Sequence, residues 1–351
     1  MKPKSEKDFR FNRKNEKMLD EEDGIVTLHH INMTLKNHKP VKHVLNIFVA
    51  QNGGYIDHNV SDDLSLLDSL LSSSASTSNV LLPLLNTFKI LLRKESNRKT
   101  LPAATIKSVL DILKHHDTPS TVRTAGSNVL LNASFERRNV SNICRERGVH
   151  ILLSILKDKK KTANILEKIS ILGALQSICF VPEGRDCMRE LEAESLFVNM
   201  LISASSFSSQ QEQQQQQDKF IARVAGVLHN LSADPRSGME IRKYHGIRPI
   251  VNLLRRYTSN PSIIISASGA LQNLAREEKS RHEILNTSDL LSNLSQMLFS
   301  SNAEFQACAV GVLLSVFNNK KDFSWLKQLL SECVVLGSLQ SAIFEEDDNS
   351  E

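Results

Sequence analysis

The stretches that decide the fold are AGVLHNLS at residues 225–232, GIRPIVNLL at 246–254 and SGALQNLA at 268–275. The first and the third share the pattern Gly-x-Leu-x-Asn-Leu, and their glycines, Gly226 and Gly269, are 43 residues apart. A fixed period of this length is typical of repeat proteins, in which each unit is one supersecondary structure that buries its apolar face against its neighbours.

The same pattern recurs more loosely as NVLLNAS from residue 128, GALQSIC from 173 and GVLLSVF from 311. The five starting positions are separated by 45, 53, 43 and 42 residues. A second block keeps phase with the first, because GVHILLSIL begins sixteen residues after Asn132 and GIRPIVNLL begins sixteen residues after Asn230. Counting back by 43 from the second block reaches apolar residues again, which predicts two degenerate repeats nearer the N-terminus.

The composition favours helices. Only 13 Gly and 9 Pro occur in 351 residues and 5% of the residues are aromatic, whereas a β-sandwich or barrel needs a turn about every 8–12 residues. Apolar residues follow the helical i, i+3, i+4, i+7 spacing in three segments of each repeat. Around Asn230 this spacing predicts helices at about 235–245, 246–258 and 260–275, with Asp234 and Pro235 as the start signal of the first.

The organisation expected from these patterns includes one low-complexity insertion. The Ser/Gln-rich segment 203–218 accounts for the 53-residue interval, and we expect it to be an exposed, mobile loop. The remaining segments are a basic disordered tail at 1–23, degenerate repeats at 24–117, clear repeats at 118–317, capping helices at 318–344 and an acidic tail at 345–351.

The repeat resembles the armadillo family, to which β-catenin and importin-α belong, clearly over 118–317 and more loosely over 24–344. The resemblance implies an all-α fold, a right-handed α-solenoid of three-helix repeats whose third helices line a concave groove for an extended peptide. It also implies that a third-helix Asn binds the ligand backbone, since its amide offers a donor and an acceptor. The candidate groove residues are Asn132, Ser177, Arg223, Asn230, Asn273 and Ser315. Capping of its own helix backbone is the alternative role for such an Asn.

A second candidate row consists of acids. Importin-α-like members carry a Trp one turn before the Asn and an acid one turn after it, which together clamp a lysine. This chain has Asn128, Gly226 and Gly269 at the Trp position, so the aromatic clamp is absent, and we expect the repeated glycines to serve close helix packing. The acid position is kept by Glu136, Asp234 and Glu277. Their alternative role is to stabilise the N-terminus of the following helix.

Other partner classes receive less support. The formal net charge of +4 is too small to indicate direct binding of nucleic acid. Nine Lys or Arg against three acids at 137–168 are a candidate surface for an acidic partner or an anionic membrane, although a solvated loop and helix rim is the commoner explanation of such a cluster. No apolar run approaches 18 residues, so we expect no transmembrane segment.

The sequence contains none of the common catalytic or metal motifs. HExxH, a Cys/His finger, a phosphate-binding P-loop and GxSxG are all absent, so we expect no catalytic residue, no metal and no cofactor. The five cysteines form no CxxC pair and indicate free thiols in a reducing compartment. The expected location is cytoplasmic and, through the basic tail, also nuclear.

These patterns predict a non-enzymatic scaffold or adaptor that binds an extended segment of a partner protein. Two alternatives remain at this stage. One is recognition of basic peptides in the manner of a nuclear transport receptor. The other is a regulator of a small GTPase or a subunit of a ciliary or ubiquitin-ligase assembly. A fold alone does not choose among them, because function depends on the site.

Overall fold

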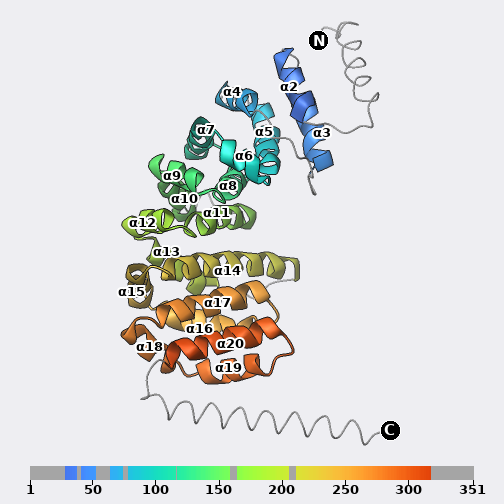
Figure 1. Ribbon diagram of the computed structural model, residues 1–351. Helices are drawn as coiled ribbons and strands as arrows, with labels where there is room; N and C mark the ends of the chain where they lie inside the picture. Colours follow the sequence, from blue (N-terminus) through green and yellow to red (C-terminus); the bar gives the residue numbers. More distant parts are fainter. Residues whose placement is uncertain are drawn as a thin grey trace, which may run out of the picture. The chain divides into compact units, whose positions relative to one another are not determined.

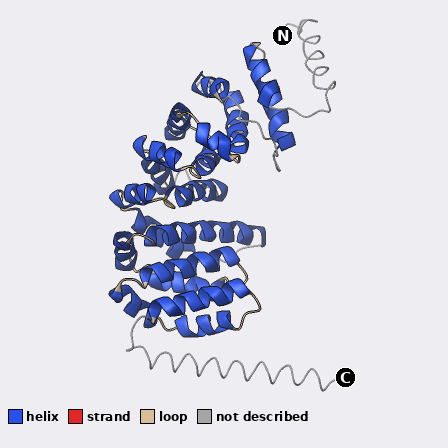
Figure 2. Ribbon diagram, viewed as in Figure 1, coloured by secondary structure: helices blue, strands red, loops and turns tan. Residues whose placement is uncertain are grey.

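The structure is a computed structural model that describes residues 28–37, 41–52, 64–73, 78–115, 117–158, 164–204 and 211–317. Helices are the only regular secondary structure in these ranges (Figure 2). The expected tails at 1–23 and 345–351 and the expected capping helices at 318–344 lie outside the described residues.

The chain divides into two compact units, Met1–Ile151 and Leu152–Glu351. In the first unit, α5 packs against α3 and α8, and α7 packs against α8. The helices of this unit are α2 (Leu28–Lys36), α3 (Lys42–Asn52), α4 (Ser65–Ser73), α5 (Ser78–Leu91), α6 (Glu95–Thr100), α7 (Ala103–Lys114), α8 (Ser120–Ala133) and α9 (Arg137–Arg145). Helix α10 (Gly148–Lys157) lies across the boundary between the units.

The second unit repeats a short first helix, a second helix and a third helix. Its helices are α11 (Ile165–Ile178), α12 (Pro182–Glu190), α13 (Ala193–Ala204), α14 (Gln211–Ser232), α15 (Pro235–Lys243), α16 (Ile247–Arg256), α17 (Pro261–Leu274), α18 (Glu278–Leu285), α19 (Leu290–Leu298) and α20 (Ala303–Val316). The third helices α11, α14, α17 and α20 pack against one another in chain order, and each second helix packs on the third helix of its own repeat (Figure 1).

The three-helix repeat predicted around Asn230 is confirmed by α15, α16 and α17. Pro182 and Pro235 each stand in the first turn of a first helix, where a proline lacks only a donor that the helix leaves unpaired. The side chains of Asp234 and Asn260 accept hydrogen bonds from backbone N–H groups in the first turns of α15 and α17. Local capping therefore sets these helix starts.

The turn from the first to the second helix explains a second set of repeated glycines. Arg147, Glu192 and His245 adopt positive φ at this turn. An added Cβ on Gly148 or Gly246 would lie 2.9 Å from the carbonyl oxygen of the isoleucine five residues earlier. The glycines at 148 and 246 are therefore required by the close approach of the two helices.

The expected loop at 203–218 is wrong at both ends, because Ser203 and Ala204 belong to α13 and the residues from Gln211 onward belong to α14. Helix α14 has 22 residues, whereas α11 and α17 have 14 each, and the extra turns are formed by the glutamine run. Glutamine is a good helix former. Gln214 donates to Asp218 one turn later, and Gln217 donates to the carbonyl oxygen of Ala204 at the end of α13. Residues 205–210 lie outside the described ranges.

Candidate functional site

One aligned row of side chains follows the third helices of the second unit. On α14 and at the residue that follows it, the row consists of Lys219, Ala222, Arg223, Gly226, His229, Asn230 and Ala233. The equivalent positions recur on α11, α17 and α20, and most of these side chains are half-buried or exposed. We call this surface the third-helix face. The predicted residues Ser177, Asn230, Asn273 and Ser315 occupy the same position on its four helices, whereas Asn132 lies on α8 in the first unit.

The three asparagines bind the backbone of the preceding layer. Asn230 donates from Nδ2 to the carbonyl oxygen of Gln176 at 2.8 Å, and Asn273 donates to that of His229 at 3.3 Å. In the first unit, Asn132 donates to the carbonyl oxygen of Lys89 at 2.6 Å. Each acceptor lies in the last turn of the preceding third helix, where the carbonyl oxygens have no backbone donor in their own helix, so these bonds join layers. The alternative of capping the same helix is wrong, because each acceptor belongs to the preceding third helix.

Each repeated glycine lies against a side chain of the preceding third helix. That side chain belongs to the residue just before the Asn position of its own helix. An added Cβ would lie 2.2 Å from Gln176 Nε2 at Gly226 and 2.4 Å from His229 Nε2 at Gly269. At Gly311 it would lie 2.6 Å from the side-chain nitrogen of Gln272. The expectation that these glycines serve packing is confirmed. The position that holds Trp in importin-α-like proteins is here crossed by a polar side chain.

Gln176 is the centre of a polar cluster between α11 and α14. Its carbonyl oxygen accepts from Asn230, and its side-chain oxygen accepts from Arg223 Nη1 at 2.9 Å. Arg223 is half-buried, and burial lowers the pKa of its guanidinium. The predicted residues Arg223 and Asn230 are thus brought together through a glutamine that the sequence analysis did not nominate.

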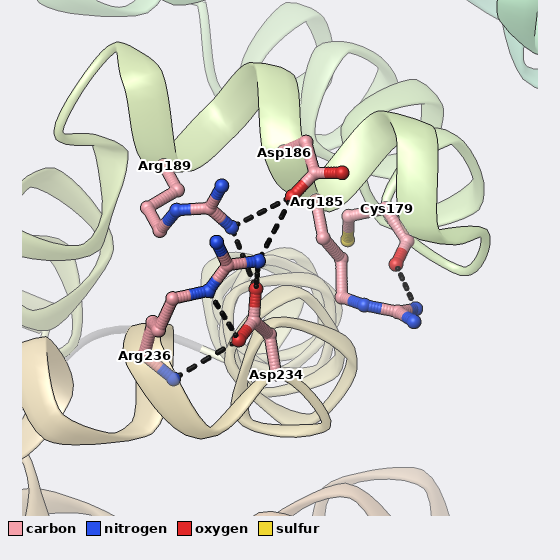
Figure 3. A network of polar contacts seen from close by, with 6 residues as sticks. All are labelled: Cys179, Arg185, Asp186, Arg189, Asp234 and Arg236. Atoms are coloured by element: carbon pink, nitrogen blue, oxygen red, sulfur yellow. Dashed lines mark hydrogen bonds and ion pairs between the residues drawn. The ribbon is translucent and has the colours of Figure 1, made fainter.

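The acid Asp234 is part of an ion-pair network at the start of α15 (Figure 3). It accepts from the backbone N–H of Arg236 at 3.0 Å and pairs with Arg189 at 2.6 Å and with the Arg236 guanidinium at 3.0 Å. Asp186 also pairs with both arginines. Burial raises the pKa of Asp234, but the hydrogen bonds from Arg236 and the positive charges of Arg236 and Arg189 together outweigh it, so the net shift is downward.

Glu277 has a matching arrangement one repeat later. Arg242 donates to both carboxylate oxygens of Glu277, at 2.9 and 3.0 Å, and Ser280 donates at 2.6 Å. In each case an arginine from the preceding first helix neutralises the acid. Glu136 begins α9 without a capping bond from its side chain. Asp234 therefore has the structural role of capping α15, whereas Glu277 makes no capping bond to the backbone of α18 and is held by its ion pair with Arg242.

We expect E277Q to lower the free energy of unfolding by about 1–2 kcal/mol at pH 7, because it replaces two charge-assisted hydrogen bonds by weaker ones. The bonds from Arg242 hold the pKa of Glu277 below its ordinary 4.5. The stabilisation is present above that value and is lost as the pH falls through the lowered pKa. Urea unfolding should therefore separate the two proteins at pH 7, and the difference between them should shrink as the pH is lowered to 3. E278Q, which changes the exposed neighbour, is the control and should shift stability by less than about 0.5 kcal/mol.

Several residues of the interfaces were missed in the sequence. A polar side chain recurs immediately before the Asn position on three third helices, as Gln176, His229 and Gln272. This recurrence is the sequence pattern that could have identified them. At the end of α11, Arg185 donates to the carbonyl oxygen of Cys179 at 3.2 Å (Figure 3). It also donates to that of Phe180 at 2.8 Å. Arg281 caps α17 in the same way through Ala275.

The described residues offer no metal site and no single membrane-spanning helix. They contain no group of three His, Cys, Asp or Glu side chains placed to hold a metal ion. In the described ranges no single helix is long and apolar enough to cross a membrane. Helices α11 and α12 reach that length and apolar composition only when taken together, and the chain bends by 119° between them. Arg137, Arg138 and Arg147 of the basic cluster are exposed on the first unit, and residues 159–163 of the cluster lie outside the described part of the chain.

Comparison with known proteins rests on structure alone. No family model matches the sequence, and no curated protein matches it either. A designed armadillo repeat protein superposes with a TM-score of 0.61 at 16% identity, covering 72% of this chain and 100% of its own. A second, solved in complex with the peptide (KR)4, has a TM-score of 0.61 at 16% identity and covers 73% and 100%.

A third match is described as computationally designed armadillo repeat proteins for modular peptide recognition, with a TM-score of 0.59 at 17% identity over 72% of this chain and 99% of that one. At such identities the likeness shows the fold. The chain is therefore an armadillo-type helical repeat protein, an all-α solenoid of three-helix repeats.

Proposed function

We propose that the chain is a non-enzymatic scaffold that binds an extended segment of a partner protein along the third-helix face. The observation that carries the proposal is the recurrence of the same half-exposed positions on four packed third helices, α11, α14, α17 and α20. One of the structural neighbours was solved with a peptide bound, which supports peptide binding as a use of this architecture.

The dimensions of the face suit an extended chain. Packed helices lie about 8–10 Å apart, and an extended peptide rises about 3.3 Å per residue. Each layer therefore corresponds to two or three ligand residues, and four layers correspond to about ten. The inter-layer bonds of Asn230 and Asn273 hold the layers in register, so the scaffold loses little conformational entropy on binding.

The alternative of basic-peptide recognition has weaker support. It depends on acids that face the ligand, but Asp234 and Glu277 are paired with Arg189 and Arg242. A basic ligand would have to displace these arginines. No observation in the described residues favours a GTPase regulator or a subunit of a ciliary or ubiquitin-ligase assembly over the general scaffold.

The proposal is tested by blocking the face. Ala222 and Ser266 are half-exposed on α14 and α17, and we expect A222W/S266W to abolish enrichment of binders from a library of random twelve-residue peptides. Binders selected on the unmodified chain should lose at least tenfold in affinity, measured by fluorescence anisotropy. R255W, which places the same ring on an exposed position of α16, is the control and should leave affinity within twofold. Equal binding to all three proteins would refute the proposal.

A further inference from the structure

Helix α9 of the first unit carries a row of arginines on its exposed side. The exposed positions of this helix are the first, second, fifth and ninth, which hold Arg137, Arg138, Ser141 and Arg145. With 3.6 residues per turn, these four positions fall within one arc of about 100°. Arg147 is exposed just beyond the helix. We call the four arginines the α9 row.

The three-helix repeat does not require these arginines. Helices α12 and α15 have nine residues each, as α9 has. Their first, second, fifth and ninth positions hold Pro182, Glu183, Asp186 and Glu190 in α12, and Pro235, Arg236, Met239 and Lys243 in α15. The fold therefore accepts charges of either sign, or none, at these positions.

The α9 row also differs from α15 in its counter-ions. On α15, Arg236 and Lys243 pair with carboxylates. In the described part of the chain, no ion pair joins Arg138, Arg145 or Arg147 to an acid, and the guanidinium of Arg145 donates to the neutral side chain of Asn142. The row is therefore a concentration of solvated positive charge that neither the repeat nor a neighbouring acid explains.

An exposed aromatic ring stands at the start of the row. Phe135 precedes Glu136, the N-cap residue of α9, and is 66% exposed. The guanidinium carbon of Arg98 on α6 lies 5.8 Å from the centre of the ring. Asn139 of α9 donates to the carbonyl oxygen of Arg98 at 2.9 Å, so the two first helices are bonded next to the ring. A partner that buries Phe135 gains from removing its apolar surface from water.

The surface of an anionic membrane offers a partner for both features. Guanidinium groups bind phosphate oxygens through paired hydrogen bonds, and clusters of four or more basic residues are attracted to anionic leaflets. The boundary between the headgroups and the acyl chains also buries exposed aromatic side chains. An acidic protein segment matches the charges of the row but supplies no apolar layer for the ring.

We propose that the α9 row and Phe135 bind the anionic surface of a membrane, with the arginines on lipid phosphates and the ring inserted among the headgroups. This activity is additional to peptide binding, because the row belongs to the first unit and the third-helix face to the second. Membrane binding and peptide binding can therefore be removed separately by substitution.

The test measures co-sedimentation of the full chain with vesicles of phosphatidylcholine, with or without about 30% phosphatidylserine. Binding should require phosphatidylserine and should weaken as ionic strength rises from about 50 to about 500 mM. R138Q/R145Q/R147Q should lose about a hundredfold in partitioning, since each basic residue near an anionic surface contributes about fivefold. F135A should lose about tenfold and keep the salt dependence, because it changes no charge.

A charge-matched control is R248Q/R255Q/K279Q, which removes three exposed basic residues of the second unit and should stay within threefold. Thermal melts establish that all variants are folded. F135W/W325F places the only tryptophan of the chain at the ring position, and its fluorescence should shift to the blue on vesicles that contain phosphatidylserine.

Equal binding to both kinds of vesicle, equal losses in the two triple variants, or an unshifted fluorescence would overturn the proposal. Arginines and exposed rings also bind the stacked bases of single strands. Binding of an oligouridine without binding of vesicles would therefore assign the row to nucleic acid and refute the membrane site.

Discussion

Replacing Gly184 by alanine should destabilise the second unit by about 3 kcal/mol or more, near the upper end of the range for overpacking. Gly184 lies in the first turn of α12, where that helix crosses the end of α11. An added Cβ would lie 1.9 Å from the carbonyl oxygen of Ile178 and 2.5 Å from its carbonyl carbon. Both atoms belong to the backbone, so no side-chain rotation relieves the clash, and α12 has to move away from α11.

Urea and thermal unfolding followed by circular dichroism would measure this effect. For a unit of this size, about 3 kcal/mol corresponds to a fall of roughly 6–12 °C in Tm. G238A is the matched control, because Gly238 occupies the first helix of the next repeat and its added Cβ would meet Leu274 Cδ2 at an ordinary 3.6 Å. There alanine should be neutral or stabilise by up to about 1 kcal/mol through helix propensity. Equal effects at the two glycines would show that the close contact at Ile178 does not decide stability.

The fold could be predicted because its determinants are local and repeated. Helix starts depend on neighbouring residues, as with Asp234 and Pro235, and the 43-residue phase of Gly226 and Gly269 marks successive layers. The helical extension of α14 could not be predicted in this way. Its glutamines are equally compatible with a low-complexity loop, and their helical state is continuous with the packed part of the helix beyond Phe220.

The candidate site was predicted less completely, for a physical reason. Asn230 and Asn273 were identified by their phase, but each amide bonds to a backbone carbonyl, and every residue carries one, so the acceptor leaves no mark in the sequence. Besides their local partners, Asp234 pairs with an arginine 45 residues away and Glu277 with one 35 residues away. Such distances follow no local spacing rule, and only the stacking of repeats brings these pairs together.

The second large effect is expected when Asn230 and Asn273 are both replaced by alanine. Each substitution removes an inter-layer hydrogen bond to a carbonyl oxygen near a helix end, that of Gln176 or His229, which then keeps only the local donor Cys179 Sγ or Ser232 Oγ. A bond of this kind contributes about 1–1.5 kcal/mol, so the double variant should lose about 2–3 kcal/mol of unfolding free energy. A cooperative urea transition that moves to lower concentration with an unchanged slope would show this loss.

S315A is the matched control for this variant. Ser315 occupies the same position on α20, but its hydroxyl donates to the carbonyl oxygen of Gly311 in its own helix, so its removal should cost less than about 0.5 kcal/mol. N230D tests the donor of the Asn230 amide by itself. The carboxylate keeps an acceptor on the third-helix face, but the donor to the carbonyl oxygen of Gln176 is lost. If the asparagines act only on a ligand, N230A/N273A and N230D will be as stable as the unmodified chain. If they join the layers, both will be destabilised in the absence of any peptide, because the broken bonds are internal to the scaffold.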